Sequence, residues 1–217
     1  MADTPRDRYP GYDVLAKRYT PSWNEQTRRV IDERLRVSRE PRFLAREEFV
    51  TLCAVVERIV PQPEHRPAIP VPALVDDKLH RNRQDGYRAA DMPRERDAWR
   101  LGLRALDAEA RAAHEVPFHQ LDAPLQDQLL ARMEKGELHH AAWGGMPPGT
   151  FFTQRLLTDI VSAYWSHPTA WSEMGFGGPA SPRGYVRMGY DERDPWEAAE
   201  ARSGDAERAL RENRRVG

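Results

Sequence analysis

Residues 150–165 read Thr-Phe-Phe-Thr-Gln-Arg-Leu-Leu-Thr-Asp-Ile-Val-Ser-Ala-Tyr-Trp, and this segment decides the fold. It is the most apolar helical segment of the chain, with paired hydrophobic residues from Phe151 to Trp165. The glycines and prolines of residues 144–149 form a hard break just before it. We therefore expect residues 150–165 to form the central helix of the protein.

Five more helices are predicted upstream of this segment. The capping-box pattern Ser22-Trp-Asn-Glu25 predicts a helix to about Val37, with an apolar stripe of Trp23, Val30, Ile31 and Leu35. Apolar spacing and helix start and stop residues predict the others at about 45–60, 72–83, 93–114 and 122–133. Trp99, Leu103, Leu106 and Ala110 lie on one face of the fourth helix, Asp122 is the expected N-cap of the fifth, and Gly136 is its expected C-cap residue.

The two ends of the chain have a different composition. Residues 1–21 are polar and rich in proline, which predicts an extended arm. Asp194-Pro195-Trp196-Glu197 is a typical helix start, and residues 191–217 are expected to be a charged helix or tail with almost no apolar face. No segment shows the alternation of a strand, so we predict an all-α fold with one irregular helical domain of about six helices over residues 22–190.

Composition excludes several classes of function. The 217 residues fit one domain, and 33 basic against 34 acidic residues leave no long-range field that would attract nucleic acid or an anionic membrane. No run approaches the roughly 18 apolar residues of a membrane span, and the first residues contain no apolar signal core. Cys53 is the single cysteine, so no intrachain disulfide forms, and we expect it to be a small buried core residue.

The segment from Tyr164 to Met188 interleaves aromatic residues with glycine and proline and has no helical or strand period. Disordered linkers are poor in aromatics, which favours a long ordered loop that packs on its own domain or on a partner. Tryptophan, tyrosine and arginine dominate binding hot spots. We therefore predict a partner-binding surface made of Trp165, His167, Trp171, Phe176, Arg183, Tyr185 and Tyr190.

Candidate catalytic and ligand-binding patterns are weak. Gly175-Phe-Gly-Gly-Pro-Ala180 matches a dinucleotide fingerprint in form, but a helix precedes it and two prolines follow it. The adjacent His139 and His140 point in different directions on a helix, and His114, Glu115 and His119 lack the spacing of a zinc motif. The sequence therefore predicts no catalytic, cofactor-binding or metal-binding residue in this chain.

His167 and Glu173 could serve as a base and an acid, but no nucleophile or orienting group is evident near them. We expect His167 instead to cap the end of the central helix, where a cation interacts favourably with the helix dipole.

Several segments, in order, resemble one family. The chain is similar to the small subunit (subunit 3, or gamma) of gluconate 2-dehydrogenase and related flavin-dependent, membrane-associated dehydrogenases. The resemblance covers roughly residues 42–190 and ends on an aromatic-His-Pro…Gly-Phe-Gly pattern. The matching segments are Phe43 to Pro63 with Arg-Ile-Val-Pro-Gln-Pro at its end, Val71–Leu79, Trp99–Asp107, Phe118–Leu121, Gln126–Leu130, Phe151-Phe152 and Asp159 to Gly177.

The resemblance implies that this chain has no catalytic residues of its own. It implies a flavin-dependent dehydrogenase as the large subunit, which carries FAD and oxidises a sugar or an alcohol, and in some complexes a c-type cytochrome. The small subunit would support folding, stability or export of the flavoprotein. Family members often carry a twin-arginine signal and this sequence shows none, so we expect a cytoplasmic location, or a periplasmic one if the partner carries the signal.

Two other functions remain open at this point. A stand-alone small helical enzyme with a histidine-based metal site would release stoichiometric metal when His139 or His140 is replaced. A self-associating structural protein would form a homo-oligomer with no other partner. If the accessory role is correct, Trp171→Ala should weaken the complex by at least about tenfold.

Overall fold

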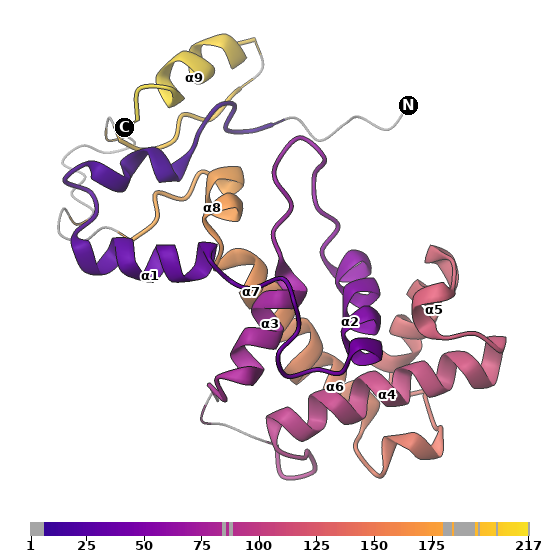
Figure 1. Cartoon of the computed structure of the whole chain (residues 1–217). Coiled ribbons are helices and arrows are strands. Elements are labelled where there is room, and N and C mark those ends of the chain that lie inside the picture. Colours follow the sequence, from indigo (N-terminus) through magenta and orange to yellow (C-terminus); the bar gives the residue numbers. More distant parts are fainter. Residues whose placement is uncertain are drawn as a thin grey trace. The chain divides into compact units, whose positions relative to one another are not determined.

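In the computed structural model of the chain, residues 7–83, 86, 89–179, 184, 194, 196–202 and 204–216 are described. Every regular element among these residues is a helix, and no strand occurs in them, which confirms the predicted all-α class (Figure 1). The described part contains nine α-helices rather than about six. None of these helices is long and apolar enough to cross a membrane.

The predicted helices are present with shifted ends. The α-helices are α1 Glu25–Leu35, α2 Arg46–Ile59, α3 Val71–His80, α4 Glu95–His114, α5 Ala123–Glu134, α6 Pro148–Phe151, α7 Thr158–Trp165, α8 Pro168–Met174 and α9 Ala206–Asn213. A π-helical segment, Phe152–Leu157, connects α6 to α7. Short 3-10 helices occupy Val14–Tyr19, Phe118–Gln120 and Ala141–Trp143.

The chain divides into two compact units. We call Val37–Glu64 with Pro70–Tyr164 the central unit, and Met1–Arg36 with His65–Ile69 and Trp165–Gly217 the terminal unit. The terminal unit therefore brings together the two ends of the sequence. The predicted division into an arm, a domain of residues 22–190 and a tail remains a prediction.

The central unit has the predicted apolar helix in its core. Phe151, Leu156 and Ile160 are completely buried. The ring of Phe151 meets the edge of Trp99 at 5.7 Å between centroids, and Gly102 makes room for it, because a Cβ there would lie 2.3 Å from that ring. The helix is thus a core element, although a π-helical segment interrupts its α-helical pattern.

Other predictions for this unit are confirmed. Trp99, Leu103, Leu106 and Ala110 form a fully buried stripe on α4. Asp122 caps α5 by accepting a hydrogen bond from the Leu125 amide at 3.0 Å, and Gly136 follows that helix with a φ of +71°.

Cys53 on α2 is half-buried rather than fully buried. This partial burial, together with nearby Glu57, raises the pKa of the thiol.

The predicted start of the first helix is wrong by two residues. Asn24, not Ser22, is the N-cap of α1, and its side chain accepts from the Thr27 amide at 2.9 Å. Ser22 and Trp23 are buried ahead of the helix, whereas Val30 and Leu35 are each 40% exposed. Only Trp23 and Ile31 of the predicted stripe therefore enter the core.

The chain ends are more ordered than predicted. Val14–Tyr19 form a 3-10 helix, so the N-terminal segment is not extended throughout. Asn213 of α9 is buried and donates hydrogen bonds to the carbonyls of Pro10 and Ala199, both at 3.0 Å. The helix predicted at Asp194 is absent, since the described residues from 196 to 202 are non-helical and α9 begins at Ala206.

Candidate partner-binding surface

Helix α8 lies within the segment that we expected to be a loop. Pro168 occupies its first turn, where a missing amide hydrogen costs nothing, and Gly175 ends it with a φ of +72°. The expectation of a segment without helical structure is therefore wrong for Pro168–Met174. A Cβ at Gly175 would lie 2.5 Å from the Tyr9 ring, so the position requires glycine for space as well as for backbone conformation.

His167 caps the start of α8. Its Nδ1 atom accepts a hydrogen bond from the Thr169 amide at 3.2 Å, which requires that nitrogen to be unprotonated. Burial lowers the pKa of His167 from 6.5 to about 4, and the positive charge of Arg34 contributes to the same shift. The predicted role of His167 as a cation at the end of the preceding helix is therefore wrong: it is neutral at pH 7 and caps the next helix.

Arg34 of α1 contacts α8 and the residue shortly before it. Its guanidinium donates to the Ser166 carbonyl at 2.9 Å and lies over the Trp171 ring at 5.6 Å. Desolvation lowers the pKa of Arg34, but arginine remains charged throughout the physiological range. Both contacts lie within the terminal unit and connect α1 to α8.

Trp171 belongs to the core of the terminal unit. It is 5% exposed and packs in a cluster with Tyr12, Val14, Trp23 and Ile31. Its indole nitrogen donates to the Trp165 carbonyl at 2.6 Å. Trp171 thus stabilises the unit itself, and its predicted contact with a partner remains a prediction.

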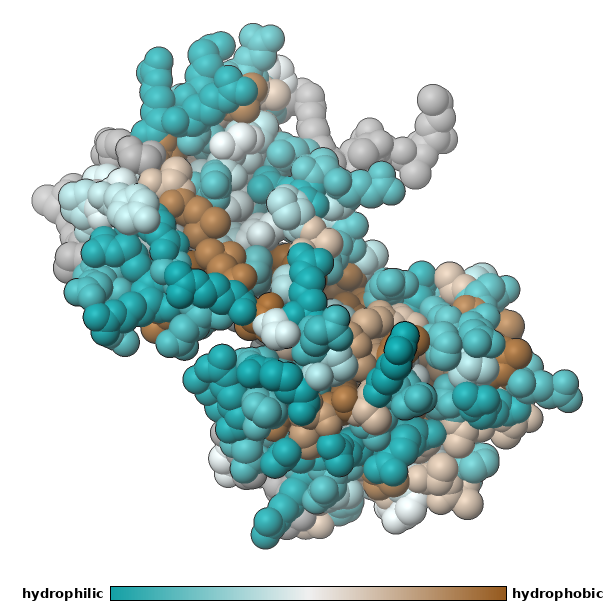
Figure 2. All heavy atoms as spheres, in the orientation of Figure 1, coloured by the Kyte–Doolittle hydropathy of each residue, from teal (hydrophilic) through white to brown (hydrophobic). Residues whose placement is uncertain are grey.

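Three large hydrophobic residues in or close to α8 in the sequence are exposed. Trp165 is 44% exposed, Met174 47% and Phe176 39%. The rings of Phe176 and the buried Trp171 form a T-shaped pair, with their centroids 5.7 Å apart. This contact supports the exposed Phe176 ring. We call Trp165, Met174 and Phe176 the α8 surface. Figure 2 shows scattered hydrophobic residues among the hydrophilic ones on the face that it draws.

The structure brings only part of the predicted site together. Trp165, His167, Trp171 and Phe176 lie around α8, as described above, whereas Arg183, Tyr185 and Tyr190 lie outside the described residues. Met174 was missed, and the helical spacing from Trp171 could have identified it once α8 was known. The described members of the predicted surface are thus grouped around a short helix, and the partner contact of the full set remains a prediction.

Of the other histidines considered as metal ligands, His140 has a local structural role. His140 caps a 3-10 helix, its Nδ1 accepting from the Ala142 amide at 3.0 Å, and its own amide donates to Glu109 at 2.7 Å. Within the residues that the structure describes, no group of three or more histidine, cysteine or acidic residues could hold a metal ion.

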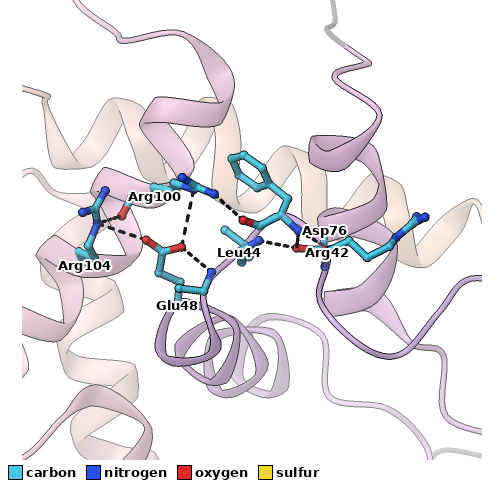
Figure 3. Close-up of polar contacts among 8 residues, drawn as sticks. Arg42, Leu44, Glu48, Asp76, Arg100 and Arg104 are labelled. Carbon is cyan, nitrogen blue, oxygen red and sulfur yellow. Dashed lines mark hydrogen bonds and ion pairs between the residues drawn. The ribbon is translucent and has the colours of Figure 1, made fainter.

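A polar network in the central unit fixes the segment ahead of α2 (Figure 3). The Asp76 carboxylate on α3 accepts hydrogen bonds from the amides of Phe43 and Leu44, at 3.1 and 2.8 Å. Glu48 accepts from the Ala45 amide at 2.9 Å and pairs with Arg104 of α4 at 3.2 Å. These contacts connect α2, α3 and α4 through residues that sequence reasoning treated as separate segments.

A second network of polar side chains lies in the same unit. Lys78 of α3 pairs with Glu95 at 2.9 Å and with Asp159 at 2.8 Å. Asp159 also accepts a hydrogen bond from the indole nitrogen of Trp99 at 2.9 Å. Lys78, Trp99 and Asp159 come from three of the segments that carry the family resemblance, so the fold brings those segments into contact.

Comparison with known proteins gives one match. The family model for gluconate 2-dehydrogenase subunit 3 matches residues 46–178, which is more than half of the chain. No curated protein and no solved structure matches the chain. The matched residues extend from the start of α2 through α8, and they include the buried Lys78–Asp159 pair and all of the α8 surface. The chain belongs to the gluconate 2-dehydrogenase subunit 3 family.

Proposed function

We propose that this protein is a non-catalytic small subunit that binds an FAD-dependent (GMC-type) sugar or alcohol dehydrogenase and supports its folding, stability or export. FAD would reside in the large subunit, and a c-type cytochrome subunit would complete the complex in some systems. The family name is consistent with a place in such an oxidoreductase complex.

The α8 surface is the observation that carries this proposal. Soluble proteins rarely leave several large apolar side chains exposed side by side unless a partner covers them. Trp165, Met174 and Phe176 are each at least 39% exposed, and they are supported by the buried Trp171. A rigid aromatic and methionine surface is typical of the central part of an interface.

Two charged residues lie close to α8. Arg34 lies within contact of Trp171, and Glu173 is part of α8 itself. Apolar centres with charged residues around them are the usual anatomy of a protein–protein interface, and the polar rim sets orientation more than affinity.

The proposal is tested by purifying the tagged protein gently from its native host and recording the absorbance of the material that co-elutes. We expect a stoichiometric partner with flavin absorbance and dye-linked dehydrogenase activity. A colourless protein that elutes alone, with no partner detected by mass spectrometry, would contradict the proposed role.

A further inference from the structure

The central unit contains an open pocket that none of the interactions above fills. Its volume is about 290 Å³, and it lies at the first turn of α4 and beside the segment ahead of α2. The lining residues are Phe43, Asn82, Arg94, Arg96, Asp97 and Arg100. Three arginines and one aspartate give this lining a formal charge of +2 (3 − 1).

Phe43, one of the lining residues, has its backbone fixed by hydrogen bonds. Phe43 is 7% exposed, and its amide donates to the Asp76 carboxylate at 3.1 Å. Its carbonyl accepts a hydrogen bond from Arg100 at 2.6 Å (Figure 3). The backbone of Phe43 is thus fixed on both sides, so its ring offers a stationary platform.

Two guanidinium groups are placed against this one ring. The Cζ atom of Arg96 lies 4.4 Å from the ring centroid of Phe43, and that of Arg100 lies 4.3 Å from it. The two arginines are four residues apart on α4, where like charges repel each other. Cation–π attraction holds both groups at the ring and offsets part of this repulsion. An anion bound in the pocket would offset the remaining repulsion between the two guanidinium groups.

Arg94 and Arg96 differ from other arginines of this unit, whereas Arg100 lies 3.9 Å from the Glu48 carboxylate. Arg58 pairs with Asp127 at 2.7 Å, Arg104 with Glu48 at 3.2 Å and Arg111 with Asp107 at 2.8 Å. Over the described residues, neither Arg94 nor Arg96 has a carboxylate within ion-pair distance. The charges of Arg94 and Arg96 are therefore not neutralised by an ion pair within the described part of the chain.

We propose that this pocket binds a phosphate group, either as free phosphate or as a small phosphomonoester. Guanidinium groups donate paired hydrogen bonds to phosphate oxygens, and three of them can surround one phosphate. A phosphate dianion also matches the two positive charges of Arg94 and Arg96, whereas a carboxylate has one charge and needs only one arginine fork. The volume is at the lower limit of small-molecule sites, which suits a phosphate with a small substituent.

The inference does not depend on the proposed accessory role, because the pocket and the α8 surface belong to different units. It also requires no chemistry from the protein, since the lining residues only bind and orient the anion. A purified full-length chain is sufficient for its test.

The test is calorimetric titration of the full-length protein with inorganic phosphate, glycerol phosphate and acetate at equal ionic strength. We expect saturable binding of one phosphate or phosphomonoester per chain, weakened at least about tenfold by Arg96→Ala and by Arg94→Ala. Arg111→Ala is the matched control, because Arg111 is on the same helix but pairs with Asp107 outside the pocket. Asp97→Asn should tighten binding, since it removes the one acidic group of the lining.

Each outcome decides the proposal. Tighter binding of glycerol phosphate assigns a phosphorylated small molecule, and equal binding of the two ligands assigns free phosphate. Absence of saturable binding, or an equal loss in the Arg111→Ala control, overturns the site. Acetate binding as tight as phosphate binding overturns the phosphate assignment and indicates a carboxylate, such as an acidic side chain of a protein partner. Arg94 is exposed, so its replacement keeps the test valid if Arg96→Ala unfolds the protein.

Discussion

The two units of this protein differ in the pairing of their buried charges and in the number of large apolar side chains that they expose. In the central unit the buried carboxylates of Glu95 and Asp159 are both paired with Lys78. Among the described residues, seven large hydrophobic side chains are exposed, and only Leu157 belongs to the central unit. The other six are in the terminal unit and include the whole α8 surface. The central unit thus buries nearly all of its large apolar side chains, whereas the terminal unit keeps several of them exposed.

The family match follows this contrast. It covers the central unit from Arg46 onward and continues through α8 to Gly178 in the terminal unit. Much of the rest of the terminal unit lies outside the match. We infer that the helical scaffold together with α8 carries the role of the family, and that α8 makes the contact with the partner.

The largest expected effect concerns Trp171. Its side chain is in the core of the terminal unit, so Trp171→Ala should destabilise that unit by about 3–5 kcal/mol. Hydrogen exchange should show lost protection in α8 and α1. If α8 and α1 kept their hydrogen-exchange protection while partner affinity fell tenfold, Trp171 would be an interface anchor. That result would contradict the assignment of Trp171 to the core rather than to the partner-binding surface.

The next effect concerns the buried charges of the central unit. Asp159→Ala leaves the Trp99 indole N–H without its acceptor and takes one of two carboxylates from Lys78, so we expect a loss of about 3 kcal/mol. Asp127→Ala is the matched control, because Asp127 is half-exposed and pairs with Arg58, and it should cost less than about 1 kcal/mol. Urea unfolding measures both. Equal losses in the two variants would show that the central unit does not depend on its buried pair.

A smaller effect is the pH dependence of the terminal unit. The folded state lowers the pKa of His167 from 6.5 to about 4, so the unfolded state binds the proton more readily between these values. Stability should therefore fall as pH decreases from 6.5 towards 4, by about 2 kcal/mol once solvent screening is allowed for. His167→Asn can still cap α8 but does not titrate, so it should remove this component. An unchanged pH profile of α8 hydrogen exchange in the variant would show that His167 is not its source.

Some elements could be predicted because their signals are local. The N-cap at Asp122, the glycine after α5 and the apolar stripe of α4 are each encoded within one or two helical turns. The all-α class followed from the absence of strand alternation. Residues that act within their own segment are therefore readable from the sequence.

Other features depend on contacts between distant segments. Asn213 is buried because it binds Pro10, which is 203 positions away in the sequence. Trp171 is buried because Arg34 and Tyr12 come from the other end of the chain, and no local pattern distinguishes it from the exposed Trp165. Helix α8 was missed because its only marks, Pro168 and Gly175, are also typical of a loop.

The smallest expected effect on stability, and the most direct test of the account, comes from Met174. Met174→Asp changes a side chain that is 47% exposed, so the free energy of unfolding should change by less than about 0.5 kcal/mol. Leu157→Asp is the control, since Leu157 is 37% exposed in the central unit.

The measurement is the affinity of each variant for the co-purified flavoprotein. We predict that Met174→Asp weakens the complex at least about tenfold, whereas Leu157→Asp leaves it unchanged. Wild-type affinity in Met174→Asp would contradict the central claim that α8 is the partner-binding surface.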